Sequence, residues 1–293
     1  MSPTATFDPI LSAAQKQQYA DEGYLLLPGL LDDDSLQAIR DVFEQAVDKQ
    51  AREWFDAGNI TDACEGLPFE KRYGALREQL PAGFSNSWRR IIVSRALYNV
   101  WRHPVLVNLM RSLIGDELYA STTWNGRPRA QNQLKQTIDW HQDAHYMPDY
   151  QEGDGHAVSV WMPLVAVDET SGCLQVAPKS NLGGLRPPTR LERNGLTGLA
   201  DSELESYQPL SCIMAPGDVL LFSELTFHRS LDNISDYVRW SLDVRFFDAD
   251  NAVLRQRDGR GNSRGYVCFS ESDPSRVETY DTWAAKYDYE GEF

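Results

Sequence analysis

Residues 238–246 alternate strictly between apolar and polar side chains, and this stretch restricts the possible folds more than any other. Successive side chains of a β-strand point to opposite faces. One face of this predicted strand carries Val238, Trp240, Leu242, Val244 and Phe246, and the other carries Arg239, Ser241, Asp243 and Arg245. Taken by itself, such a polar face is equally typical of a strand that lines a cleft and of an edge strand that faces water.

Other short runs after Gly115 have the same strand character, because they are rich in β-branched and aromatic residues and are separated by turn signals. They cover residues 117–124, 132–138, 157–167, 172–178, 218–223 and 265–270. Several short strands in succession predict a sandwich, a jelly roll or a barrel.

The part of the chain before Gly115 reads as mostly helical. Apolar residues recur at helical spacing, or helix start and stop signals occur, in residues 32–50, 85–101 and 103–115, whereas residues 23–31 read as a strand and a turn. We therefore predict one domain over residues 1–293, with a mainly helical part (1–115), a β core (116–270) and a C-terminal tail (271–293). The polar stretch 183–209 is predicted to be an insertion that forms a loop or lid.

Composition excludes several classes of function. The net charge is −15 and the chain has no basic block, which argues against nucleic acid and anionic membranes as partners. No stretch approaches 18 apolar residues, so we expect no membrane span, and no signal peptide is apparent. The four cysteines lie far apart without a CxxC pair. This spacing suits a reducing compartment, so the expected location is cytoplasmic.

The stretch WHQDAHYMP, residues 140–148, contains the first candidate ligands. If His141 and Asp143 lie in an extended strand end, their side chains point the same way; the alternative is a polar turn beside the core. His228 ends an apolar strand and is the expected third ligand. Of the other histidines, we interpret His103 as a helix boundary residue, His145 as pocket wall or packing, and His156 as solvated.

Two histidines and one carboxylate leave three positions of a metal open, an arrangement associated with non-haem Fe(II) oxygenases. The open positions can take a bidentate 2-oxo acid and then O₂. The distal carboxylate of such an acid needs a planar, permanently charged partner, which an arginine provides. Arg239, eleven residues after His228, fits this role, and Ser230 could add a hydroxyl donor.

The ordered set His141, Asp143, His228, Ser230 and Arg239 resembles the phytanoyl-CoA dioxygenase family of Fe(II)/2-oxoglutarate oxygenases. The resemblance covers roughly residues 15–50 and 100–250, and its one departure is Lys179-Ser180-Asn181, where the family usually has Ser/Thr-His after a proline. It implies a double-stranded β-helix, a jelly-roll barrel whose mouth holds the metal. Residues 51–99 match nothing in the family pattern.

The resemblance also implies roles for individual residues. His141, Asp143 and His228 would be the metal ligands and the catalytic centre, and 2-oxoglutarate would be bound by Arg239, Ser230, Trp161 and Gln133. Candidate substrate contacts are Tyr146, Lys135 and Arg186. Some of these residues also have plain structural interpretations: Trp161 suits the core, Gln133 and Lys135 suit an exposed strand face, and Arg186, Arg190 and Arg193 suit a solvated loop.

The predicted reaction is hydroxylation of a small metabolite or natural product, with release of succinate and CO₂. The retained carboxylate of Asp143 favours hydroxylation over halogenation. Desaturation, epimerisation and cyclisation stay open, as do a non-catalytic jelly-roll binding protein and a cupin-like enzyme that does not use 2-oxoglutarate. The expected partner is a small-molecule substrate, and the expected state is a monomer or a homodimer.

Overall fold

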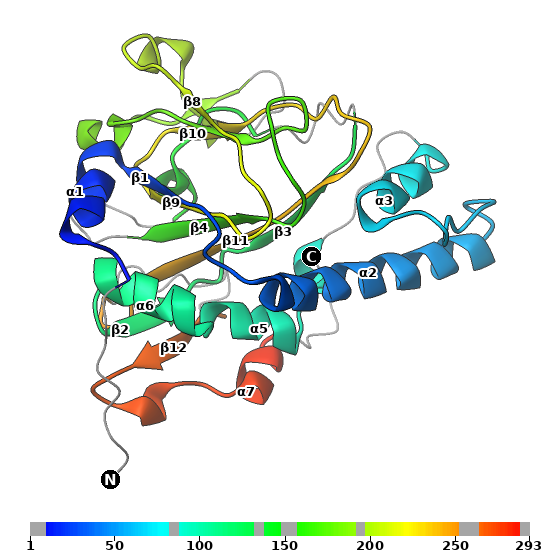
Figure 1. Ribbon diagram of the computed structural model, residues 1–293, viewed down its shortest axis with the longest axis horizontal. Coiled ribbons are helices and arrows are strands. Elements are labelled where there is room, and N and C mark those ends of the chain that lie inside the picture. The colour runs from blue at the N-terminus through cyan, green and yellow to red at the C-terminus, as the bar shows by residue number, and fades with distance from the viewer. Residues whose placement is uncertain are drawn as a thin grey trace.

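Two antiparallel sheets form a sandwich at the centre of the molecule (Figure 1). The structure is a computed structural model, and it describes residues 10–81, 88–131, 138–147, 157–191, 197–251 and 264–287. In Figure 1 the smaller sheet lies above the larger one, and helices α2 (Asp33–Asp56), α5 (Arg95–Trp101) and α6 (Pro104–Leu113) lie below it. This arrangement is the predicted jelly roll with helical decoration.

The larger sheet has the order β1-β9-β4-β11-β2-β12, with β3 also paired to β11. Its strands are β1 (Tyr24–Leu27), β2 (Glu117–Ala120), β3 (Asn125–Arg129), β4 (Val158–Pro163), β9 (Val219–Ser223), β11 (Arg239–Asp248) and β12 (Tyr266–Ser270). The smaller sheet has the order β10-β5-β8, and its strands are β5 (Leu174–Val176), β8 (Leu210–Cys212) and β10 (His228–Ser230). A separate two-stranded ribbon in the insertion consists of β6 (Thr189–Arg190) and β7 (Thr197–Gly198).

β11 is a central strand, so its polar face cannot be the solvent-facing side of an edge strand. It pairs with β4 on one side and with β2 and β3 on the other. The four side chains of the polar face are all buried: Arg239, Ser241, Asp243 and Arg245. Of the two interpretations that the alternation allowed, the cleft-lining one is confirmed.

The helices cover the outer face of the larger sheet. They are α1 (Ala13–Glu22), α2 (Asp33–Asp56), α3 (Phe69–Glu78), α4 (Trp88–Ile91), α5 (Arg95–Trp101), α6 (Pro104–Leu113) and α7 (Tyr280–Ala284). Asp32 caps α2 by accepting a hydrogen bond from the backbone N–H of Ser35 at 2.9 Å, so the helix predicted from residue 32 begins there. The single helix expected over residues 85–101 is wrong, because its described part consists of α4 and α5, and a new N-cap at Ser94 starts α5.

Alternation within each strand divides the interior into two compartments. Val160 of β4 and Leu242 of β11 belong to the core between the sheet and the helices, which also contains Phe43 of α2. Trp161 of β4 and Phe222 of β9 point the other way, into the space between the sheets. Neighbouring residues of one strand thus face opposite sides of the larger sheet. The helices stabilise the sheet from its outer side, and the space between the two sheets remains available for a site.

β3 was not predicted, because Gly126 and Pro128 are unfavourable strand residues. Both have a local reason here. A Cβ at Gly126 would lie 2.5 Å from the Cζ of Phe43, so glycine lets β3 pass close to α2. Pro128 lacks a backbone N–H, which β3 tolerates because it pairs with β11 alone.

The segment expected to be a C-terminal tail contains α7, which is part of the core. Trp283 is buried and packs against Tyr266 of β12, with ring centroids 5.8 Å apart. Among the described residues, no helix is both long and apolar enough to cross a lipid bilayer.

Candidate metal centre

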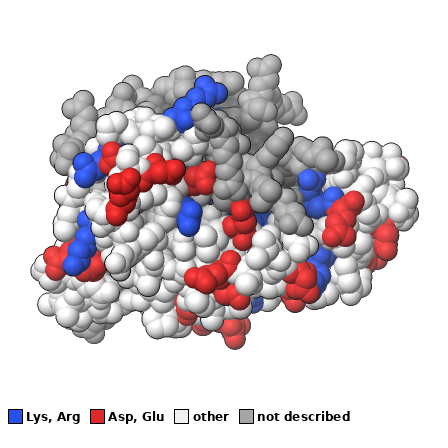
Figure 2. Space-filling model, turned by 90° about the horizontal axis from the view of Figure 1, so that it is seen from above, with Lys and Arg blue, Asp and Glu red and all other residues white. Residues whose placement is uncertain are grey.

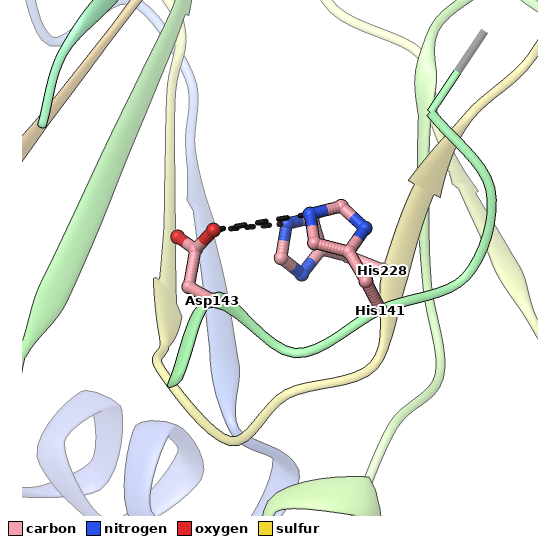
Figure 3. Close-up of side chains that lie close together, drawn as sticks. All are labelled: His141, Asp143 and His228. Carbon is pink, nitrogen blue, oxygen red and sulfur yellow. Dashed lines mark ion pairs between the residues drawn. The ribbon is translucent and has the colours of Figure 1, made fainter. Parts of the chain in front are cut away.

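Three buried side chains converge at one end of the space between the sheets: His141, Asp143 and His228 (Figure 3). Asp143 Oδ1 lies 3.8 Å from His141 Nε2 and 3.7 Å from His228 Nε2. The two imidazoles lie side by side, with ring centroids 4.1 Å apart, and the carboxylate faces both. The structure thus brings together the three residues that were predicted to form a metal site.

The backbone that positions this group differs from the expected strand end. His141 pairs with His228 through an isolated antiparallel bridge, with two backbone hydrogen bonds of 3.1 Å. Asp143 is not extended; it starts a 3-10 helix, Asp143–Tyr146. The expectation that His141 and Asp143 point the same way because both lie in an extended strand is therefore wrong. Their side chains nevertheless reach the same point.

Hydrogen bonds orient both imidazoles. Nδ1 of His141 lies 2.8 Å from the carbonyl oxygen of Asp139, and Nδ1 of His228 lies 3.0 Å from that of Thr226. A carbonyl only accepts, so each Nδ1 carries a hydrogen and each Nε2 keeps its lone pair toward Asp143. Burial, helped by His228, lowers the pKa of His141 to about 3. Burial also lowers the pKa of His228, against an opposing effect of Asp143. Both rings are neutral at neutral pH, as a metal ligand must be.

Asp143 is ionised and held by two neighbours. Burial by itself would raise the pKa of this carboxyl, but the positive charge and hydrogen bonds of Arg245, together with the effects of His228 and His141, outweigh burial and keep the pKa well below its usual range. Arg245 donates from Nε to Oδ2 at 2.8 Å and from Nη2 to Oδ1 at 3.0 Å. Ser159 donates from its hydroxyl to Oδ2 at 2.5 Å.

A cavity adjoins the histidines and contains Arg239, Ser230 and Trp161, three of the residues expected to bind 2-oxoglutarate. The space between its atoms is about 390 Å³, a value that includes open solvent at its mouth. Trp161 is also part of the core between the sheets, which agrees with its structural interpretation. Its ring centroid lies 5.6 Å from the Cζ of Arg239.

Arg239 is the most unusual side chain of the cavity. It is 1% exposed, and none of its three guanidinium nitrogens has a hydrogen-bond partner among the described residues. Burial, reinforced by Arg127, lowers the pKa of Arg239 to about 9, so the group is still charged at neutral pH. The hydroxyl of Ser230 is likewise buried without a partner in the described part of the chain. A buried cation without a counter-ion is costly, and an anionic ligand would remove that cost.

The cavity differs in charge from the surface. Its lining includes five arginines: Arg127, Arg129, Arg229, Arg239 and Arg245. On the described part of the face in Figure 2, acidic and basic side chains are interspersed. Because the chain as a whole has a net charge of −15, this cation-rich cavity attracts an anionic ligand to the site and not to the rest of the protein.

The remaining site predictions have mixed outcomes. Tyr146 is 42% exposed, lies with its ring centroid 5.7 Å from that of His141, and donates to the carbonyl of Thr197 at 2.7 Å. Arg186 does not line the cavity; its Nε faces Glu203 Oε2 at 3.4 Å, so the structure offers no support for a substrate contact there. Gln133 and Lys135 lie outside the described residues.

Three residues of the site were not predicted: Arg245, Ser159 and Gln142. Gln142, between the two ligands of the HxD motif, is completely buried and donates to the carbonyls of Gly184 and Leu225 at 2.9 and 2.8 Å. Its Oε1 accepts from the backbone N–H of Arg186 at 2.8 Å. The polar face of residues 238–246 was a signal for Arg245, whereas nothing in the local sequence pointed to Ser159 or Gln142.

The donor set fits a divalent metal of the iron type. Two neutral imidazole nitrogens and one carboxylate oxygen on one side of a cavity form a facial triad with the other positions open. Ligands about 2.0–2.2 Å from a shared ion lie roughly 3.0–3.5 Å apart, so the observed 3.7 and 3.8 Å require only a small contraction.

The fold is a jelly roll with two histidines and a carboxylate beside a cavity, and the cavity contains a buried arginine. These features define a class of β-sandwich proteins with a site suited to a metal ion and an anion together. Comparison with known families narrows this class. The chain belongs to the phytanoyl-CoA dioxygenase family, because the model described as Phytanoyl-CoA dioxygenase (PhyH) matches residues 19–241.

Individual relatives are distant. The chain is 23% identical over 250 residues to the peroxisomal phytanoyl-CoA dioxygenase of Bos taurus, covering 82% of this chain and 70% of that protein. It is 26% identical over 166 residues to 1-deoxypentalenic acid 11-beta-hydroxylase of Streptomyces arenae, covering 52% of this chain and 57% of that protein.

Solved structures agree with the fold. The carbocyclase SnoK from nogalamycin biosynthesis superposes with a TM-score of 0.58 at 18% identity, over 82% of this chain and 85% of that one. The epimerase SnoN, in complex with Fe³⁺, alpha-ketoglutarate and nogalamycin RO, superposes with a TM-score of 0.56 at 19% identity, over 93% and 96%. At these identities the similarity is one of fold.

Proposed function

We infer that this protein is an Fe(II)- and 2-oxoglutarate-dependent dioxygenase that hydroxylates a C–H bond of a small metabolite or natural product. The proposal is carried by the pairing of a triad of two neutral histidines and an ionised aspartate with Arg239 in the adjoining cavity, a buried cation without a hydrogen-bond partner among the described residues. A triad of this kind can bind many metals. A buried arginine beside it favours a metal site that also binds an acid with a distal carboxylate.

In this proposal His141, His228 and Asp143 hold the iron. Arg239 and Ser230 bind the distal carboxylate of 2-oxoglutarate, and Trp161 contacts the co-substrate from the side. When bound, Fe(II) with 2-oxoglutarate and O₂ supplies the oxidising chemistry, with succinate and CO₂ as co-products. Gln133 remains a candidate for the co-substrate, and Tyr146 and Lys135 remain candidates for the substrate.

The chain's own residues orient and shield the reactants. The carbonyls of Asp139 and Thr226 hold both imidazoles in the Nδ1–H form, so that Nε2 is free to bind without losing a proton. Burial of the guanidinium of Arg239 removes competing water and strengthens its attraction for a carboxylate. The apolar side chains of Trp161, Leu174 and Phe222 limit solvent on that side of the cavity.

Hydroxylation is the proposed outcome because Asp143 occupies the position that must be vacant for a halide, and because a relative is named as a hydroxylase. SnoK and SnoN, with the same fold, are named as a carbocyclase and an epimerase, so the fold does not select the outcome. Four cysteines without a disulfide support a cytoplasmic location as part of this proposal.

The deciding experiment combines binding and turnover. Under anaerobic conditions, Fe(II) and 2-oxoglutarate should give the weak visible absorption of an iron–2-oxoglutarate complex with the wild-type protein. Asp143→Ala should lose this absorption and all substrate-dependent succinate release. Lack of the absorption with wild-type protein, or full succinate release by the variant, would contradict the proposal.

Product analysis then separates the possible outcomes. A metabolite screen with oxygen present should yield a product that has gained one oxygen atom. A product that has lost two hydrogens without gaining oxygen would indicate cyclisation or desaturation, and no conversion of any candidate despite iron binding would favour a binding protein.

A further inference from the structure

Arg245 and Ser159 are direct neighbours across two strands and together hold one carboxylate. Arg245 on β11 pairs with Ser159 on β4 in the antiparallel register. Both side chains are buried and both donate to Asp143, which lies on a different segment, 102 residues before Arg245. A cross-strand pair thus controls the orientation of a residue in the metal centre.

The two oxygens of Asp143 are not equivalent in this arrangement. Oδ2 accepts from the hydroxyl of Ser159 at 2.5 Å and from Nε of Arg245 at 2.8 Å, which uses both of its lone pairs. Among the described residues, Oδ1 accepts from Nη2 of Arg245 alone, at 3.0 Å, and it is the oxygen that faces the two histidines. One lone pair of Oδ1 therefore remains for a metal, whereas Oδ2 has none to give.

Arg245 is itself fixed by a second carboxylate. Its Nη1 donates to Oδ1 of Asp243 at 2.7 Å, two residues away on the same face of β11. Asp243 in turn accepts from Asn125 at 2.9 Å and from Arg127 at 3.1 Å, both on β3. The charges alternate in sign from the partly exposed Arg127 to the buried Asp143, so each has a counter-ion and the planar guanidinium of Arg245 is held from two sides.

We propose that Arg245 is a positioning residue that, with Ser159, restricts Asp143 to binding the metal through Oδ1 alone. This inference rests on the proposed function, in which the metal takes 2-oxoglutarate and O₂. Three protein ligand atoms leave three positions open, two for the 2-oxo acid and one for O₂. If Asp143 bound through both oxygens, one of these positions would be lost, so the arginine–serine pair preserves the third open position.

The first test is the affinity for a metal alone, which requires neither substrate nor turnover. Co(II) is titrated into the full-length protein and followed by calorimetry and visible absorption. Arg245→Lys keeps the positive charge but cannot donate to both oxygens in parallel. We expect it to bind Co(II) about 10–100-fold more weakly than the wild type, as is usual when a partner of a metal ligand is lost.

Arg111→Lys is the matched control. Arg111 also bridges two carboxylates, Asp116 at 2.7 Å and Glu271 at 3.1 Å, but on α6, outside the site. It should leave Co(II) affinity unchanged. An Arg245→Lys affinity equal to that of the wild type, or lowered only as much as in Arg111→Lys, overturns the proposal.

Ser159→Ala tests the ligand mode and decides alone if Arg245→Lys does not fold. It removes a single hydroxyl and frees one lone pair of Oδ2, so bound Co(II) should gain an oxygen ligand, seen by X-ray absorption and as a changed visible spectrum. A spectrum identical to that of the wild type contradicts the proposal. If the wild-type protein itself binds no Co(II), the proposed function fails; if it binds and both variants match it, only the present inference fails.

Discussion

Arg239 is the residue at which stability and function most clearly oppose each other. Its guanidinium is buried and charged, yet has no hydrogen-bond partner among the described residues. The charge of Asp243 acts favourably on it, whereas that of Arg127 acts against it. Such a group destabilises the ligand-free fold and becomes favourable only when an anion binds.

We therefore predict that Arg239→Met stabilises the ligand-free protein while it weakens 2-oxoglutarate binding. The gain should be about 1–4 kcal/mol in the free energy of unfolding, the range found when buried charged groups are replaced by apolar ones. Affinity for 2-oxoglutarate should fall at least ~30-fold, since losing one partner of a buried charge pair costs about 2–5 kcal/mol. Chemical denaturation and equilibrium binding measure the two effects.

Arg276→Met is the comparison for this prediction. Arg276 is paired with Glu117 at 2.9 Å and Asp250 at 2.7 Å, away from the cavity, so its loss should not stabilise the protein. An Arg239→Met protein that is less stable than the wild type would show that this arginine already has a good partner in the ligand-free state.

At the scale of elements, the insertion at 183–209 is joined to the segment that carries the metal ligands. Gln142 makes three hydrogen bonds to backbone groups, two of them to Gly184 and Arg186 of the insertion. Leu199 N–H donates to the carbonyl of Trp140 at 2.8 Å, and Tyr146 donates to Thr197. The described part of the insertion is thus attached on both sides of the HxD motif, so its movement would be coupled to His141 and Asp143.

Gln142→Ala should loosen this attachment. Loss of hydrogen bonds worth about 1 kcal/mol each should raise the open population of the insertion by roughly tenfold or more. Trypsin cleavage after Arg190 or Arg193 should accelerate in proportion, as measured by mass spectrometry of early fragments.

Gln79→Ala provides the control for local loss of an amide. Gln79 also accepts from two backbone N–H groups, of Thr61 at 2.9 Å and Asp62 at 3.0 Å, far from the insertion in the sequence. Equal rates of cleavage in the insertion for Gln142→Ala and the wild type would mean that other contacts hold this segment.

At the scale of the whole molecule, the sandwich and its helical layer enclose most of the cysteines. Cys173, Cys212 and Cys268 are buried, and burial raises the pKa of Cys173 to about 11 and that of Cys212 to about 12. Cys64, which follows α2, is only partly buried. The reactivity of the cysteine thiols therefore measures how completely the fold shields its interior from solvent.

We predict that one thiol per chain reacts with a disulfide reagent in the native protein at pH 7–8, and that this thiol is Cys64. Burial and Asp62 raise its pKa as well, so the reaction is rapid relative to that of the other three thiols and slower than that of a free thiol. The other three should react only as the protein unfolds, because a buried thiol with a raised pKa provides almost no thiolate. The absorbance of the released reagent counts the thiols that react, and peptide mapping identifies them. Cys64→Ser should abolish the rapid phase. Rapid labelling of Cys268 in the native protein would contradict the described packing of β12.

Local patterns were enough for the features that depend on neighbouring residues. Strict alternation over 238–246 and the short apolar runs predicted the strands β4, β9, β11 and β12 and a sandwich, jelly roll or barrel, and the resemblance to a known family narrowed these to the jelly roll. The order of His141, Asp143, His228 and Arg239 predicted the residues of the candidate site. The same patterns failed for β3, where close packing on α2 outweighs strand propensity, and for the backbone at Asp143, which forms a 3-10 turn.

The sequence by itself determined the fold class, the residues that converge at the candidate metal centre and the arginine beside it, because periodicity and motif spacing are local properties of the chain. The tertiary structure alone decided that β11 is central, that Ser159 and Arg245 meet across β4 and β11 to hold Asp143, and that Gln142 fastens the insertion. These contacts join segments tens of residues apart. They depend on strand order and register, which only the packing of the complete chain specifies.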